Sequence, residues 1–274
     1  MVFSKLRKIS LGLATIMTLS LATPAYAKSE YNEGDILALG SSLNQAQEQE
    51  IRNFLNAPDG TKTIYVTNEM IIEQLGLDPN DQSNYAGGCY SSAYVKLTND
   101  KNGIQVDARN LTEVTSSMLM NALITSGITS ASVKVTAPFK VTGTSALAGI
   151  LAGVENAGGF EISLKKKETA QKEIETTIGI GEEVGQEEAS TIINDVKTEI
   201  IKESPKTEAE IEKIVDEVTK EYAVELSEAA KEQIVSLMKE VNELDIDYSQ
   251  VKDVLEKAGD KLKDNLKDLG VKLK

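Results

Sequence analysis

Hydrophobic and polar positions change period several times along the first half of the chain. Residues 35–40 and 62–67 form short apolar or alternating runs, which are typical of β-strands, and a pattern of helical spacing follows each run. The first predicted helix carries Ile51, Phe54 and Leu55. Ser42 and Gln45 before it have the spacing of a capping box. A shorter helix is expected over residues 68–75, ending at Gly76.

Two alternating segments come next, at residues 91–99 and 103–110, with only three residues between them. This spacing predicts a β-hairpin. A helix over residues 115–126 then stops at Gly127, and a last strand and helix lie within residues 135–157. Helices that alternate with short strands in this order predict an α+β domain, with a mixed sheet and packed helices, over residues 28–160.

Residues 161–274 have the pattern of amphipathic helices throughout, which predicts an all-helical C-terminal region. Breaks are expected at Pro205, at residues 226–227 and at residues 245–247. We expect the apolar stripes to be core. They comprise Ile192, Ile193, Val196 and Ile200; Ile211, Ile214, Val215, Val218 and Tyr222; Ile234, Leu237, Met238, Val241 and Leu244; and Val251, Val254, Leu255, Ala258, Leu262, Leu266 and Leu269.

Residues 135–157 read VTAPFKVTGTSALAGILAGVENA and raise the question of a ligand site. A phosphate-binding loop needs a Lys and a fixed glycine spacing, and both are missing here. The helix from Ser145 is also too short to cross a membrane. Its small residues indicate tight packing, and we expect Gly149 or Gly153 to lie against another backbone.

Gly143, Thr144 and Ser145 stand where this helix begins. Backbone N–H groups at a helix N-terminus can bind a small anion. Ordinary capping by the Thr or Ser hydroxyl is the favoured alternative, because such caps begin many helices.

The first 27 residues have the three parts of a secretory signal peptide. Three basic residues precede an apolar run at residues 11–22, and the small-residue site Ala25-Tyr26-Ala27 follows. We therefore expect cleavage after Ala27 and an extracytoplasmic protein. A membrane anchor is disfavoured, because the run is shorter than the ~20 residues that cross a bilayer.

The remaining chain has 26 Lys and Arg against 43 Asp and Glu, a net charge of −17. Phosphate groups would repel so acidic a chain, so nucleic acid is not an expected partner.

The composition excludes several kinds of chemistry. The chain contains no His, which removes Ser-His and Cys-His nucleophiles and His-ligated zinc. Cys89 is the one cysteine, and we expect it to pack as a small apolar residue. Residues 78–84 and 245–247 are acidic but predict turns rather than calcium loops. No metal, cofactor or catalytic residue is expected.

Four segments carry a family resemblance: VTAPFKVTGTSALAGI, IYVTNEMI, MLMNALITSGI and IVSLMKEVNELDIDY. With them the chain resembles the YpuA-like family of secreted proteins from Firmicutes, catalogued as domain of unknown function 1002. The resemblance spans nearly the whole chain after residue 27. It implies an exported two-part protein of the cell envelope and supplies no catalytic residues.

These observations favour a non-catalytic binding or structural module that meets an envelope protein or a wall component. The alternative is an exported hydrolase that uses carboxylates or a Ser/Lys pair on the α+β domain. The last helix is locally basic and could touch an anionic membrane surface. Packing of its apolar stripe is favoured over that contact, because interspersed Asp residues blunt the attraction.

Overall fold

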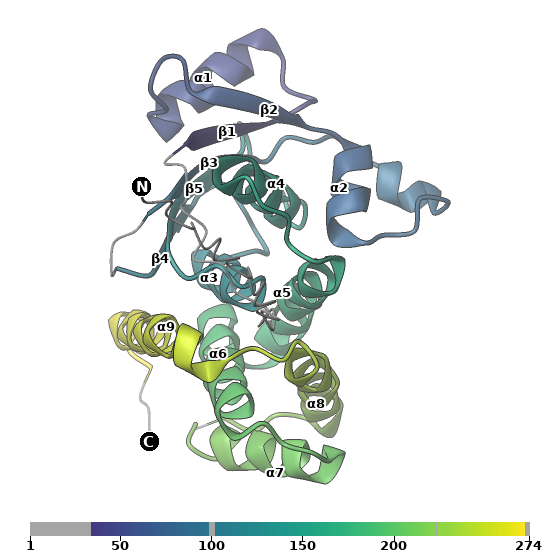
Figure 1. Cartoon of the computed structure of the whole chain (residues 1–274), viewed down its shortest axis with the longest axis vertical. Helices are drawn as coiled ribbons and strands as arrows, with labels where there is room; N and C mark the ends of the chain where they lie inside the picture. The colour runs from purple at the N-terminus through teal and green to yellow at the C-terminus, as the bar shows by residue number, and fades with distance from the viewer. Residues whose placement is uncertain (1–33, 99–101, 223, 272–274) are drawn as a thin grey trace, which may run out of the picture. The chain divides into compact units, whose positions relative to one another are not determined.

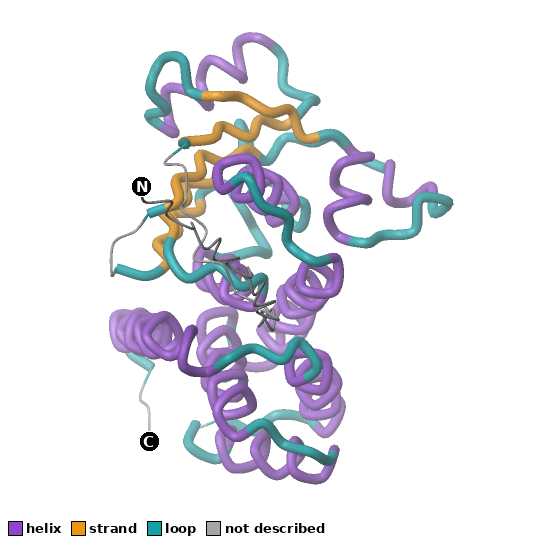
Figure 2. Tube along the Cα trace, in the orientation of Figure 1, coloured by secondary structure: helices purple, strands orange, loops and turns teal. Residues whose placement is uncertain are grey.

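The computed structural model describes residues 34–98, 102–222 and 224–271 (Figure 1). The predicted signal peptide, residues 1–27, lies outside the described residues. The described residues all belong to one compact unit. A mixed sheet with packed helices comes first and a helical region follows, so the predicted α+β class is confirmed (Figure 2).

Five strands form one sheet in the order β2-β1-β3-β5-β4. Strand β3 runs antiparallel to both of its neighbours, while β2 is parallel to β1 and β4 is parallel to β5. The four mutually parallel strands therefore end at the same edge of the sheet. The strands are β1 (Asp35–Gly40), β2 (Lys62–Val66), β3 (Ser92–Leu97), β4 (Ile104–Ala108) and β5 (Ala131–Thr136).

The predicted hairpin between β3 and β4 is wrong. Strand β5 lies between them, and Val133 pairs with Val95 on one side and with Val106 on the other. Side chains of β5 such as Val133 and Val135 are 1% exposed there, so the insertion buries an apolar strand in the sheet interior. Alternation predicts a strand, but it does not choose the neighbour with which that strand pairs.

Within the described residues, ten helical elements surround and extend the sheet. The pattern predicted α1 to α4 within one or two residues but not η1, which lies where a turn was expected, and the helical C-terminal region is also confirmed. They are α1 (Gln45–Leu55), α2 (Asn68–Leu75), the 3-10 helix η1 (Gln82–Tyr85), α3 (Ser116–Thr125), α4 (Ala146–Gly158), α5 (Leu164–Val184), α6 (Gln186–Glu203), α7 (Glu208–Thr219), α8 (Glu228–Asn242) and α9 (Tyr248–Asp268).

The start of α1 differs from the prediction. Its capping box is made by Asn44 and Gln47, whose side chains each accept from the other's backbone N–H at 3.0 Å. The hydroxyl of Ser42 accepts instead from the backbone N–H of Cys89 at 2.9 Å. Ser42 is thus engaged with the loop before β3, which leaves the cap to Asn44.

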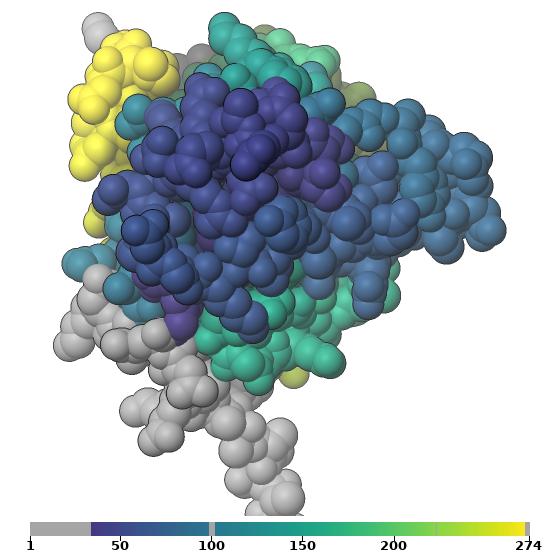
Figure 3. All heavy atoms as spheres, turned by 90° about the horizontal axis from the view of Figure 1, so that it is seen from above, coloured from purple at the N-terminus to yellow at the C-terminus, as the bar shows by residue number. Residues whose placement is uncertain are grey.

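Alternate residues of the sheet face two different helical layers. Ile36 and Ala38 belong to the main core with α4, whereas Leu37 and Leu39 pack on Ile51 and Leu55 of α1 in a small separate cluster. Phe54 of the same helix is 45% exposed, and its ring lies under the Arg109 guanidinium. Figure 3 shows α2 and η1 projecting from the side of this sheet layer.

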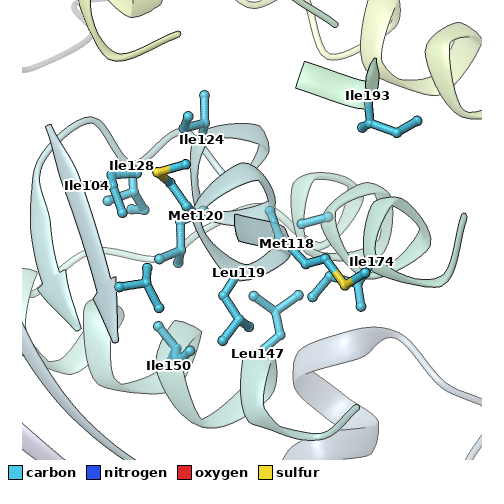
Figure 4. Packing of buried hydrophobic residues seen from close by; sticks show 14 of the residues in the cluster. Ile104, Met118, Leu119, Met120, Ile124, Ile128, Leu147, Ile150, Ile174 and Ile193 are labelled. Atoms are coloured by element: carbon cyan, nitrogen blue, oxygen red, sulfur yellow. The ribbon is translucent and has the colours of Figure 1, made fainter. Parts of the chain in front are cut away.

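Helix α3 lies at the centre of the main core, and every residue from Ser117 to Thr125 is buried. Figure 4 shows its side chains reaching three neighbours: Met120 lies toward Ile104 of β4, Leu119 toward α4, and Met118 toward Ile174 of α5. One continuous core therefore runs from the sheet into the helical region.

The apolar stripes of the helical region pack into this core. In α9, Leu255, Leu262 and Leu266 are at most 1% exposed, and the helix packs against α6 and α3. The predicted packing of this stripe is confirmed except at its end, where Leu269 is 66% exposed. Leu269 follows the last residue of α9 and lies beyond the helices that cover the stripe.

The glycines of α4 lie against the sheet as tightly as predicted, but they touch side chains rather than another backbone. A Cβ on Gly153 would lie 2.9 Å from Val95 Cγ2, and one on Gly149 would lie 3.2 Å from Val66 Cγ2. Absence of a side chain thus lets α4 settle directly onto the β-branched residues of β2 and β3. The close approach offsets the intrinsic helix cost of Gly, up to ~1 kcal/mol.

Gly153→Leu is expected to lower the free energy of unfolding by about 1–3 kcal/mol, because the new side chain overpacks the contact with Val95. Gly179→Leu in α5 is the matched control. Gly179 is exposed, and its nearest neighbour, Gln233 Oε1, is 3.4 Å from the Cβ position, so this variant should be neutral or stabilised. Urea denaturation measures both, and a Gly153→Leu protein as stable as the parent would contradict the packing account.

Candidate functional site

Gly143, Thr144 and Ser145 lie together in the loop between β5 and α4, and Thr144 is exposed. The expected hydroxyl cap is absent: Ser145 occupies the N-cap position of α4 with helical backbone angles and no side-chain capping bond. Gly143 has a φ of +91°, and a Cβ there would lie 3.0 Å from Leu111 Cδ1. Local conformation and the Leu111 contact explain the glycine without a ligand, and anion binding here stays a prediction.

Cys89 lies nearby, before β3, and is 4% exposed. Its thiol donates to the side-chain oxygen of Asn68 at 2.9 Å. Burial raises the pKa of the Cys89 thiol, against a smaller opposing effect of a hydrogen bond with Ser41. A buried, protonated thiol is a poor nucleophile, so Cys89 is built as a packing residue of the main core.

A charged group is buried where α3 meets the helical region. Lys197 of α6 is completely buried, and its ammonium donates to Glu173 of α5 at 2.7 Å, to the carbonyl oxygen of Asn121 at 2.9 Å and to Thr125 Oγ1 at 3.1 Å. Thr125 donates in turn to the other oxygen of Glu173. Burial lowers the pKa of Lys197, and the adjacent Glu173 carboxylate opposes that shift.

The partners of Lys197 belong to a polar stripe on α3 that the sequence analysis missed. Ser117, Asn121 and Thr125 are four residues apart, so they share one face of the helix. Ser117 donates to Glu187 of α6 at 2.5 Å, and Asn121 donates to the carbonyl of Ser190 at 2.9 Å. That regular spacing of polar residues in an otherwise apolar helix was the available signal. The stripe has no route to solvent at Lys197, which suits a structural joint and not a reaction site.

A Ser/Lys contact does occur, but in the helical region. Lys172 of α5 donates to Ser236 Oγ of α8 at 2.9 Å. The same ammonium is paired with Glu240, and the Lys172 side chain is 32% exposed. A lysine that acts as a base is held in a desolvated pocket, whereas this one is partly exposed and bound to a carboxylate. This arrangement is therefore a surface ion pair with an added hydroxyl.

The acidic turns chosen from the sequence are local hydrogen-bonded structures. Asp78 accepts from the backbone of Asn80 at 2.8 Å, and Asp81 caps η1 through Ser83. Asp247 caps α9 through Ser249. Across residues 34–98, 102–222 and 224–271, no group of three or more acidic or Cys side chains is placed to hold a metal ion. Nor does any helix within those ranges have the length and apolarity to cross a membrane.

Two adjoining hollows lie on the surface of the helical region. The first, about 590 Å³, lies between the end of α6 and α7, and the second, about 300 Å³, lies where α9 crosses α6. They share Glu199, Val218 and Glu221, so they form one continuous depression, which we call the α6–α7–α9 groove. Eight acidic residues line it: Asp195, Glu199, Glu203, Glu210, Glu217, Glu221, Glu256 and Asp260.

Three basic residues accompany these acids, namely Lys206, Lys213 and Lys263. Lys263 is paired with Asp195 at 3.0 Å, and Asp195 also accepts from the hydroxyl of Tyr222 at 2.7 Å. Burial and the Asp195 charge raise the pKa of Tyr222, which keeps its hydroxyl protonated as a donor. The groove is therefore an open, strongly acidic surface on a rigid helical support.

Comparison with known proteins identifies the family. Residues 39–258 match the family described as protein of unknown function (DUF1002). The chain is 34% identical over 257 residues to the uncharacterized protein YpuA of Bacillus subtilis (strain 168), covering 93% of this chain and 88% of that protein. The chain belongs to this family. No solved structure gives a significant match.

Membership of the DUF1002 family confirms the resemblance seen in the sequence. The matched range reaches from the end of β1 to the middle of α9, so it includes most of the sheet, the buried joint and the α6 and α7 sides of the groove, and it ends just before Gly259, Asp260 and Lys263. Membership of this family assigns no reaction to the chain, so its function is inferred from its side chains.

Lys197→Met is expected to lower the free energy of unfolding by about 3–5 kcal/mol, because it leaves the Glu173 charge buried without its partner. The double variant Lys197→Met/Glu173→Leu should lose less than this single variant. Lys202→Met is the control, since Lys202 forms an exposed pair with Glu199 and exposed pairs add little to stability. Equal losses for Lys197→Met and Lys202→Met in urea denaturation would contradict the buried joint.

Proposed function

We propose that this DUF1002 protein is exported and acts in the cell envelope as a non-catalytic binding module. The observation that carries the proposal is the α6–α7–α9 groove, an open acidic depression formed by three helices. Surfaces with charge of one sign attract and orient partners of the opposite charge. The order of basic, apolar and small residues before Ala27 supports export.

The state of the potentially reactive groups supports binding over hydrolysis. Cys89 is buried with a raised pKa, Lys197 is locked in an interior ion pair, and Lys172 is paired with Glu240 beside Ser236. Each of these groups is engaged in holding the fold together. The alternative, a hydrolase, would use a Ser/Lys pair on the α+β domain, whereas the Lys172–Ser236 contact lies in the helical region.

Membrane contact through the last helix is not part of the proposal. The stripe that would enter a membrane surface includes Leu255, Leu262 and Leu266, and these side chains are buried against neighbouring helices. An interfacial helix needs its apolar face available to lipid.

N-terminal sequencing of the major cellular form tests the export step. We expect it to begin at Lys28 and to fractionate outside the cytoplasmic membrane, because the signal-peptide regions are present in order. Recovery of intact residues 1–27 on the major form would contradict export.

Crosslinking on intact cells, followed by identification of the attached molecule, tests the binding role. We expect one envelope protein or wall component to be recovered reproducibly with this protein. A variant that combines Glu199→Gln, Glu217→Gln and Glu221→Gln should reduce that yield, because all three side chains line the groove. If no envelope component is attached to the parent protein, the binding role fails.

A further inference from the structure

The floor of the α6–α7–α9 groove carries a polar group that the fold leaves without a partner. Asn194 of α6 lines the hollow at the α6–α9 crossing and is 1% exposed, and its Oδ1 makes no hydrogen bond. Its Nδ2 has only a long contact of 3.4 Å, to Asp195 Oδ1. A buried acceptor left unpaired costs about 1–3 kcal/mol, which an apolar side chain of similar size would avoid. The carbonyl oxygen of Asn194 is suited to accept from a donor that enters the hollow.

The hollow at this point is opened by a glycine. Gly259 lies in the interior of α9 and lines the same hollow, and a Cβ there would lie 3.2 Å from Asn194 Nδ2. Gly in a helix interior is unfavourable by about 1 kcal/mol relative to Ala. The missing side chain lets α9 cross close to α6 and leaves the amide of Asn194 at the floor.

Most of the charged groups around this floor are carboxylates, and the one lysine among them, Lys263, is paired with Asp195. Glu221 and Asp260 are exposed lining residues that form no ion pair within the part of the chain described here. Glu256 and Glu199 add two more carboxylates, each with an exposed lysine partner on its own helix. A carboxylate ring over a carbonyl oxygen suits an ammonium or a guanidinium, which only donate hydrogen bonds.

The length of the groove distinguishes a chain segment from a small amine. The acidic lining continues from Asp260 past Glu221 to Glu203 and Glu210, across three helices. One small cation would engage only the floor at Gly259, whereas an extended segment with several cationic side chains would meet carboxylates along the whole depression.

We propose that the α6–α7–α9 groove binds a Lys- or Arg-bearing segment of a partner protein, with one cationic side chain seated in the hollow lined by Asn194, Gly259 and Asp260. This inference rests on the proposed binding function and specifies its partner as a basic polypeptide. Charge complementarity supplies attraction along the groove, and Asn194 supplies the point at which one side chain is held.

The test uses a labelled oligolysine peptide and the protein in the form isolated from cells, with fluorescence anisotropy as the readout. We expect saturable binding that weakens with added salt. The double variant Glu221→Gln/Asp260→Asn should weaken binding about tenfold. Its control, Glu212→Gln/Glu232→Gln, removes the same charge from exposed positions of a different hollow and should stay within about twofold of the parent.

Asn194→Leu separates binding from folding. We expect its Tm to equal or exceed that of the parent, because the unpaired acceptor is removed, while its affinity for the peptide falls about threefold to tenfold. A purely structural role for Asn194 would leave the affinity unchanged. Equal weakening by the two charge-removing double variants would show attraction to overall charge alone, and spermidine binding as tightly as the peptide would show a small-amine site. Each of these results would overturn the proposal, as would a parent protein that does not bind the peptide.

A photo-crosslinking amino acid, placed at one of two positions of the protein on intact cells, distinguishes the groove proposal from the general binding role. In one variant it replaces Glu256 in the groove, and in the other it replaces Glu50, which is exposed on α1. Attachment of a protein from position 256 supports the groove proposal. Attachment from position 50 alone would leave a binding role standing and overturn the groove, and attachment from neither would contradict both.

Discussion

The complete burial of α3 is the constraint on which the rest of the structure depends. A helix enclosed by the sheet, α4, α5, α6 and α9 has no solvent for its polar side chains, so each must be matched by a neighbour. Ser117, Asn121 and Thr125 are matched by Glu187, Ser190 and the Glu173–Lys197 pair. Because those partners come from α5 and α6, one register of the helical region against the sheet supplies all of these hydrogen bonds, and of the polar atoms in the stripe only Asn121 Oδ1 is left without a partner. Apolar packing alone would permit small shifts between the layers, whereas a buried ion pair with directed hydrogen bonds does not.

The sequence pattern predicts most elements because their local signals agree with their surroundings. Residues 35–40 and 62–67 form short apolar or alternating runs, as strands do. The side chains of Thr67 and Thr115 cap the starts of α2 and α3, and Gly76 ends α2 with left-handed backbone. The pattern fails where a distant segment decides the outcome. Strand β5 lies between β3 and β4. Ser42 does not cap α1, because its hydroxyl accepts a hydrogen bond from the backbone N–H of Cys89, 47 residues away. These are choices between competing partners, which local periodicity does not contain.

The candidate site was less accessible to prediction than the fold. Stripes of apolar residues identified the inner faces of α6, α7 and α9, but the groove is formed by acidic side chains on the outer faces of these helices. Glu199, Glu221 and Asp260 come from three separate segments and are ordinary exposed acids when read singly. Gly143, Thr144 and Ser145 were chosen for their place before a helix; backbone conformation and Leu111 explain Gly143, and anion binding by the three stays a prediction. Only the glycine at position 259, inside a strong helical pattern, marked the crossing in the sequence.

The buried joint and the surface groove share one helix, and this explains how an exposed acidic depression keeps a fixed shape. Asn194 and Lys197 are three residues apart on α6; Lys197 is held by α3 and α5, while Asn194 meets α9 at Gly259. Movement of α6 that altered the groove floor would also separate the Lys197 ammonium from Glu173 in an interior without water. The cost of that separation keeps the floor in place before any partner arrives. Binding to a preformed surface loses less conformational entropy than binding to a mobile one, so the interior charge would favour the binding that we propose for the groove without touching the partner.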